Sequence, residues 1–174
     1  MDSDESWLLR LDQLRRNSEI RIDEKGVWWH ANQLFEHERV IDALNKGLDW
    51  RSEIPESTDL VTPLESWCGE ATVSIGTQWC YVDYVFTPFL VTKLRMDEET
   101  KTLIAKLNTG EEYRLGPLAL YQDIVFSRLH FNRLARFSVY AQLQTMDWLR
   151  EDEIGDLMIE YQGTRWPIII IENT

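Results

Sequence analysis

The sequence has no apolar run long enough to span a membrane. A transmembrane helix needs roughly 20 consecutive apolar residues, and the longest apolar run here, residues 166–171, is far shorter. Residues 1–5 are acidic, whereas a secretory signal begins with basic residues. We therefore expect no membrane partner and no export, and we predict a soluble, cytoplasmic protein.

Cysteine is scarce as well. Cys68 and Cys80 are the only two, and there is no Cys-x-x-Cys pair to hold a structural zinc ion. A hairpin that turns at residues 76–78 would place Cys80 near Ser74 and Cys68 near Phe86. Because a disulfide needs Cα atoms within about 7 Å of each other, this register excludes one. We expect two reduced, buried thiols.

Positive charge is in deficit. The chain carries 18 Lys and Arg against 30 Asp and Glu, so its formal net charge is −12. Such a field repels phosphate backbones and anionic lipid surfaces, so neither nucleic acid nor a membrane is expected as a partner. The eight glycines are scattered singly, without the GxGxxG or Walker spacing that cradles phosphates. We predict no cofactor.

Motifs for catalysis and metal binding are also missing. No Gly-x-Ser-x-Gly elbow marks an activated serine. The two cysteines could meet His30 or His130 only through the tertiary fold. His37 has no second ligand four residues further along its predicted helix. The sequence therefore predicts no catalytic residue and no metal site.

What the chain does contain is enough apolar surface for one ordinary domain. With 174 residues, 44% of them apolar, it can bury roughly 70% of the surface that the unfolded chain exposes. We predict a single domain over residues 1–174, with an N-terminal subdomain ending near residue 57 as the alternative.

Apolar periodicity predicts an α+β fold. Helical spacing marks an N-terminal helix at 4–17 and a second helix near 35–48. Between them, alternation at 19–23 and 27–30 around a Lys-Gly turn predicts a β-hairpin. Residues 59–116 alternate in short segments separated by turns, which favours a meander of antiparallel strands.

The C-terminal third adds strands and a further helix. We predict a strand at 123–127, a long helix near 129–149, and terminal strands at 157–159 and 168–171. No βαβ alternation is present, so a doubly wound parallel sheet is not expected. The prediction is one mostly antiparallel sheet flanked by helices.

Several segments in this order resemble a known family. They are residues 22–30 (IDEKGVWWH), the helix ending at Gly47-Leu48, and residues 60–65 (LVTPLE), 109–112 (TGEE), 134–140 (LARFSVY) and 163–167 (GTRWP). Together they resemble a family of uncharacterised bacterial proteins, domain of unknown function 1285 (DUF1285), over residues 19–171. The resemblance implies a bacterial, cytoplasmic α+β protein. It implies no activity and supplies no catalytic residues.

Aromatic residues give the most distinctive candidate site. The chain has eight tryptophans, and Trp28 and Trp29 are neighbours on a predicted strand, so their rings point to opposite faces of the sheet. One can enter the core, while the other faces solvent, a partner or another element. The central strands are enriched in the same way by Trp67, Trp79, Tyr81 and Tyr84. We nominate Trp28, Trp29 and the adjacent His30 as ligand- or partner-binding residues.

Arg133 and Arg136 are further binding candidates. At i, i+3 on the predicted long helix, they could clamp a carboxylate or a phosphate. The alternative is that both arginines pair with acidic residues of the chain itself.

These observations favour a non-catalytic binding or protein-interaction module that presents an aromatic patch on a sheet. Its ligand is an unidentified small molecule or protein. The alternative is a hydrolase-like enzyme in which His30 and a carboxylate act together in a pocket. A third hypothesis is a subunit that buries an apolar patch in a homodimer.

Overall fold

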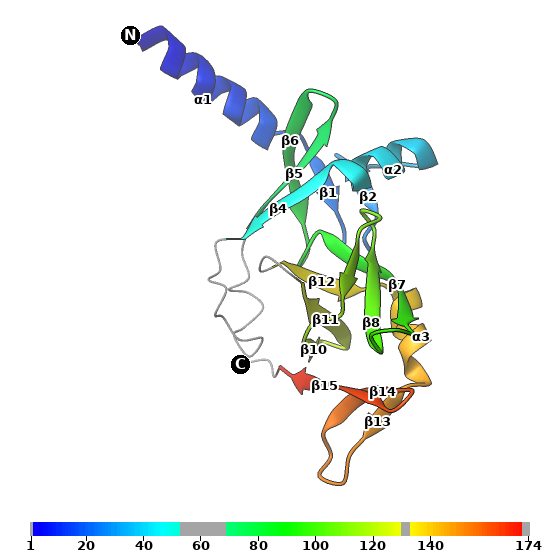
Figure 1. Cartoon of the computed structure of the whole chain (residues 1–174). Helices are drawn as coiled ribbons and strands as arrows, with labels where there is room; N and C mark the ends of the chain where they lie inside the picture. Colours follow the sequence, from blue (N-terminus) through cyan, green and yellow to red (C-terminus); the bar gives the residue numbers. More distant parts are fainter. Residues whose placement is uncertain (1, 53–68, 130–132, 172–174) are drawn as a thin grey trace.

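The fold contains two mixed β-sheets and three helices. The computed structural model describes residues 2–52, 69–129 and 133–171. Figure 1 shows α1 projecting from one end of the molecule and the β13–β14 hairpin lying at the other end. The helices are α1 (Asp2–Arg16), α2 (Glu38–Gly47) and α3 (Val139–Met146). None of these three is long and apolar enough to cross a lipid bilayer.

The first half of the chain forms a six-stranded sheet with the order β3-β2-β1-β6-β5-β4. Its β1–β2 hairpin closes where Asp23 accepts hydrogen bonds from the backbone N–H groups of Lys25 and Val27, and Gly26 takes a positive φ. Strands β4 and β5 pair with each other from either side of residue 57. The strands are β1 (Ile20–Ile22), β2 (Trp28–His30), β3 (Gln33–Leu34), β4 (Leu48–Ser52), β5 (Gly69–Ile75) and β6 (Gln78–Tyr84).

The second half forms a nine-stranded sheet with the order β13-β14-β15-β10-β11-β12-β7-β8-β9. Three pairs, β1–β6, β10–β15 and β12–β7, run parallel, while the other described pairs are antiparallel. The predicted α+β fold with mostly antiparallel strands is confirmed. The strands are β7 (Phe89–Asp97), β8 (Thr102–Leu107), β9 (Glu112–Arg114), β10 (Leu118–Tyr121), β11 (Ile124–Arg128), β12 (Leu134–Phe137), β13 (Leu149–Glu151), β14 (Leu157–Tyr161) and β15 (Thr164–Ile170).

One hydrophobic cluster joins the two sheets. Trp28 and Trp50 enter it from the six-stranded sheet, and Phe89, Phe126 and Ile159 enter it from the nine-stranded sheet. The rings of Trp50 and Phe89 meet edge to face with centroids 6.2 Å apart. Such aromatic packing stabilises beyond the area that it buries, so the sheets share a core.

The long helix predicted near 129–149 is wrong in extent. Residues 134–137 form β12, which pairs with β7 and β11, and the helix α3 starts only at Val139. Ser138 caps it by accepting a hydrogen bond from the backbone N–H of Ala141. All four residues of β12 are buried. A strand buried on both faces lacks the alternation of apolar and polar residues that identifies a strand, so its pattern does not distinguish it from a buried helix.

Within the described residues, the other predicted elements are present with small shifts, and residues 59–68 of the predicted meander lie outside the described residues. Cys80 pairs with Val73, one residue away from the predicted Ser74, because the β5–β6 turn contains only Gly76 and Thr77. Cys80 is a free thiol, and burial raises its pKa. Cys68 lies outside the described residues.

Candidate functional site

The six-stranded sheet has one face that is turned away from the core. Its register places paired side chains on the same side, because successive residues of a strand alternate between faces. Trp28 is buried on the core side, and Trp29, its neighbour, lies on the opposite side. We call this opposite side the outer face. It consists of Arg21, Trp29, Leu34, Asp49, Arg51, Glu70, Thr72, Ser74, Trp79, Tyr81 and Asp83.

Each aromatic ring of the outer face lies beneath a guanidinium group. The Arg21 guanidinium carbon is 4.9 Å from the centroid of the Trp29 ring, to which it is paired across β1 and β2. Two further arginines come from the last turn of α1: Arg15 lies 3.9 Å from the Trp79 ring and Arg16 lies 4.0 Å from the Tyr81 ring. A cation over the face of an aromatic ring is attracted by the ring quadrupole. The rings of the outer face therefore favour cations, which here are arginines of the chain itself.

Carboxylates reinforce this preference. Arg16 donates hydrogen bonds to Asp12 and Glu70, both at 2.8 Å, and to the Tyr81 hydroxyl at 3.1 Å. The hydrogen bond to Glu70 raises the pKa of Arg16, and the hydrogen bond from Arg16 lowers the pKa of Asp12. The ionised forms of Arg16 and Asp12 are thus both stabilised, as in an ion pair within the chain.

A hollow of about 310 Å³ lies beside the rings of Trp79 and Tyr81, over which Arg15 and Arg16 stack. The Trp79 and Tyr81 rings meet in an edge-to-face arrangement with centroids 5.4 Å apart. The other lining residues are Asp49, Arg51, Glu70, Thr72 and Ser74. The hollow thus combines two aromatic rings, two carboxylates, three hydroxyl groups and the Arg51 guanidinium, so it offers a ligand more acidic than basic groups and several hydrogen-bond acceptors.

The predicted tryptophans occupy opposite faces, as expected for neighbours on a strand. Trp28 is 2% exposed, and its indole N–H donates to Asn45 at 2.9 Å. Trp29 is half-buried, and its indole N–H donates to Asp23 at 3.0 Å. Partial burial would raise the pKa of Asp23. Hydrogen bonds from Val27, Trp29 and the Lys25 backbone outweigh this effect, so the pKa lies below its ordinary value.

His30 is exposed beside this pair. Its ring centroid lies 6.4 Å from that of Phe35, in a tilted arrangement. Across the parts of the chain that the structure describes, no carboxylate forms an ion pair with His30. The hydrolase-like alternative therefore gains no supporting contact here and stays a prediction.

The two predicted arginines contact the chain itself. Arg133 pairs with Asp49 at 2.8 Å, and its guanidinium lies over the Phe89 ring. Arg136 is 1% exposed and donates to the backbone carbonyls of Asp23 and Glu24. Burial lowers the pKa of Arg136, an effect opposed by the nearby acids. The helical spacing that would have aligned the two arginines is absent, because residue 136 belongs to a strand.

The sequence analysis placed Trp79 and Tyr81 on a strand but did not nominate them as binding residues. Their i, i+2 spacing was a usable signal, since it puts both rings on one face. The contribution of Arg15 and Arg16 was missed, because α1 and β6 lie far apart in the sequence. Trp67 is outside the described residues.

Comparison with known proteins supports the fold. No protein-family model and no curated protein matches the sequence. A crystal structure of a DUF1285 family protein from Silicibacter pomeroyi DSS-3 matches with a TM-score of 0.59 and 12% identity, covering 88% of this chain and 80% of that one. A DUF1285 family protein from Shewanella baltica OS155 gives a TM-score of 0.49 and 11% identity, covering 74% of this chain and 90% of that one. The chain has the fold of the Silicibacter DUF1285 protein, so the resemblance predicted from the sequence is confirmed at the level of the fold.

Proposed function

We propose that the protein is a non-catalytic binding module whose outer face recognises arginine side chains of a protein partner. One observation carries the proposal: the rings of Trp29, Trp79 and Tyr81 each already hold a guanidinium group of the chain itself. A surface that stacks three arginines in one chain has the chemistry to stack those of another. Arginine suits such a surface better than lysine because its planar group both stacks and donates in a fork.

The overall charge supports a basic partner. At a formal net charge of −12, the chain attracts cationic surfaces over distances of about a Debye length and speeds their encounter. The same charge opposes nucleic acid and anionic membranes. We place the module in the cytoplasm, where a free thiol such as Cys80 stays reduced.

The stacked arginines of α1 can be displaced at small cost. Arg16 and both of its carboxylate partners, Asp12 and Glu70, are about half exposed. Exposed ion pairs and cation–π contacts are weak, because water and salt compete for the charged groups. A partner arginine that enters the hollow could therefore replace Arg15 or Arg16 over the rings.

The proposal can be tested with a dye-labelled oligoarginine peptide, titrated while its fluorescence anisotropy is followed. Oligolysine of the same length should bind more weakly, and oligoglutamate should not bind. The double variant Trp79→Leu/Tyr81→Leu should lose about fivefold or more in affinity for oligoarginine, because two ring contacts are removed. The matched control is Tyr140→Leu, which removes an exposed aromatic ring from α3 and should change nothing.

A second variant tests whether the arginines of α1 compete with those of a partner for the rings. Arg15→Ala/Arg16→Ala removes the competing guanidinium groups as well as positive charge, so oligoarginine should bind more tightly. Equal affinities for oligoarginine and oligolysine, unchanged by loss of the two rings, would contradict the proposal.

A further inference from the structure

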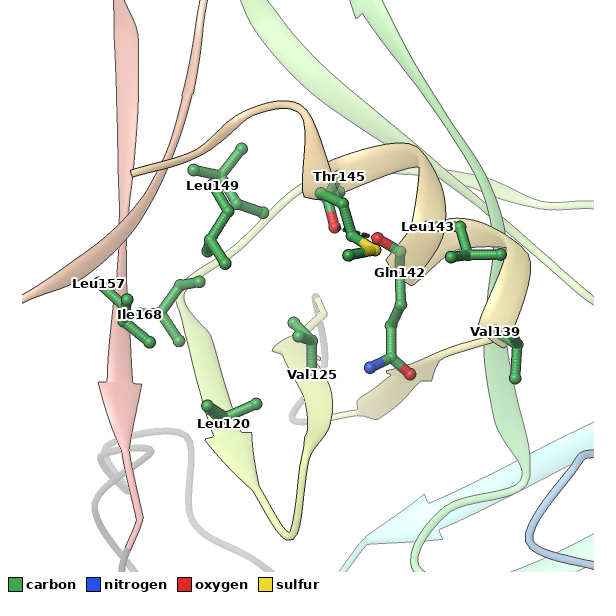
Figure 2. Close-up of a pocket in the computed structure, with 11 residues that line it drawn as sticks. Leu120, Val125, Val139, Gln142, Leu143, Thr145, Leu149, Leu157 and Ile168 are labelled. Carbon is green, nitrogen blue, oxygen red and sulfur yellow. Dashed lines mark hydrogen bonds between the residues drawn. The ribbon is translucent and has the colours of Figure 1, made fainter. Parts of the chain in front are cut away.

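An apolar groove lies on the nine-stranded sheet, beside α3. Figure 2 shows Leu120 and Val125 at its base, Leu157 and Ile168 on the strand side, and the helix on the other side. Its volume is about 380 Å³, within the range of roughly 300–1,000 Å³ typical of small-molecule sites. We call this cavity the α3 groove.

The lining of the α3 groove is almost entirely aliphatic. Among the residues that the structure describes, no charged and no aromatic side chain lines it. Its two polar side chains already donate hydrogen bonds within the chain: Gln142 donates to the Asp123 carbonyl at 2.9 Å, and Thr145 donates to the Gln142 carbonyl at 2.8 Å. A charged group of a ligand would lose its water here without gaining an ionic partner.

The apolar surface continues out of the groove along α3. Val139, Leu143 and Met146 follow one another at i, i+4, i+7 and are 71%, 58% and 64% exposed. All three also line the groove, so they form its rim. Contiguous exposed apolar patches are rare on monomeric proteins, and where they occur they often mark a binding site.

We propose that the α3 groove binds an unbranched aliphatic chain and leaves the polar head of the ligand at the rim. A flexible saturated chain has no polar atoms and fills a cavity that has aliphatic walls and no aromatic ring to stack on. The head is not anionic, because the described lining of the groove offers no cation to neutralise a carboxylate and the chain as a whole carries −12. This site is separate from the outer face, and neither proposal depends on the other.

The test uses the methyl resonances of the four methionines of the full chain, labelled with carbon-13. Octanol, decanol and dodecanol are titrated in turn, together with decanoate. The Met146 methyl should shift, whereas those of Met96 and Met158, which do not line the groove, should stay in place. Each added methylene should tighten binding by about fourfold if it is fully buried, and decanol should bind at least as tightly as decanoate.

Two variants test the location. Leu120→Trp fills the base of the groove and should abolish the Met146 shift. Since a core substitution can impair folding, Leu143→Gln on the exposed rim gives a second measurement, with an expected loss of about threefold or more for decanol. Ile154→Gln is the matched control, because Ile154 is 83% exposed and lies outside the groove.

Two results would overturn the proposal. One is an unmoved Met146 resonance with every alcohol. The other is a dimer, detected by light scattering, that Leu143→Gln dissociates, together with alcohol affinities that do not depend on the length of the alkyl chain. The groove would then be covered by a second copy of the protein.

Discussion

The outer face and the α3 groove are opposites in chemistry. The outer face combines three aromatic rings with three arginines and several carboxylates, and its contacts are polar and partly solvated. The α3 groove is aliphatic, and its lining includes no titratable side chain. The outer face should therefore respond to salt and pH, whereas the groove should respond mainly to the apolar area that a ligand brings.

The difference follows from how each surface is built. The outer face is one side of a sheet, where alternation places every second residue, so polar and aromatic residues can gather without disturbing the core on the other side. The groove lies between a helix and strands that belong to the core itself. Its aliphatic lining is a continuation of the core to the surface, which explains why α3 exposes Val139, Leu143 and Met146.

The largest expected effect comes from the buried arginine that links the two sheets. Arg136 on β12 donates to the carbonyls of Asp23 and Glu24 in the β1–β2 turn. Arg136→Met removes both donors. The Asp23 carbonyl still accepts a hydrogen bond from the Gly26 N–H at 3.0 Å, whereas the Glu24 carbonyl loses the partner that Arg136 supplied, which costs about 1–3 kcal/mol. The free energy of unfolding, measured in denaturant, should fall by about 2 kcal/mol. The free energy of unfolding of Arg136→Lys should lie between those of Arg136→Met and the native chain. Lysine keeps the positive charge but lacks the two parallel donors of the guanidinium group.

The same variant should affect the two sites unequally. Asp23 also holds the Trp29 indole, so loosening this turn should disturb the outer face and leave the Met146 resonance in place. Arg150→Met is the control: Arg150 is exposed, and one of its guanidinium N–H groups donates to the neighbouring Leu149 carbonyl. Equal disturbance of both sites would show that Arg136 supports the whole core rather than one turn.

The sequence predicted those parts of the fold whose pattern is local. The helix at α1 and the β1–β2 hairpin follow from apolar spacing and from a turn that needs a positive φ at Gly26. The opposite orientations of Trp28 and Trp29 follow from strand geometry alone. β12 was predicted as a helix, because full burial on both faces removes the alternation that identifies a strand.

Neither candidate site could be completed from the sequence. On the outer face, Arg16 reaches Glu70 and Tyr81 across more than fifty residues of chain, and no local pattern encodes that contact. The α3 groove is lined by Leu120 of β10 and Ile168 of β15. These two strands are far apart in the sequence and pair in parallel only in the tertiary fold. Periodicity identifies faces, whereas a site depends on which faces meet.

A pH titration of Asp23 should give an effect smaller than that of the Arg136 variants. The folded pKa of Asp23 lies below its ordinary value, so its contribution to stability is present above the unfolded pKa of about 3.9 and is lost as the pH falls through the folded pKa. The Trp29 indole N–H resonance should therefore move below about pH 4. The Met146 methyl should not move in the same range, because no titratable side chain lines the groove. Asp23→Asn should remove the Trp29 transition, and a transition that persists in this variant would assign it to another carboxylate.

The smallest expected effect tests the groove through one hydroxyl. Thr145 is buried, lines the groove and donates to the Gln142 carbonyl. Thr145→Val removes that hydrogen bond, so the free energy of unfolding should fall by about 0.5–1 kcal/mol. The lining becomes more apolar at the same time, so decanol should bind about twofold more tightly. Stability and affinity should thus change in opposite directions.

Thr92→Val is the matched control for that pair of changes. Thr92 on β7 also donates its hydroxyl, to the Lys106 carbonyl at 3.0 Å, but it does not line the groove. Its replacement should lower stability by a similar amount and leave decanol binding unchanged. If both variants weakened decanol binding in proportion to their loss of stability, the groove would depend on the rigidity of the fold rather than on its aliphatic lining. The contrast with the outer face would then no longer hold, since both surfaces would be governed by the same property.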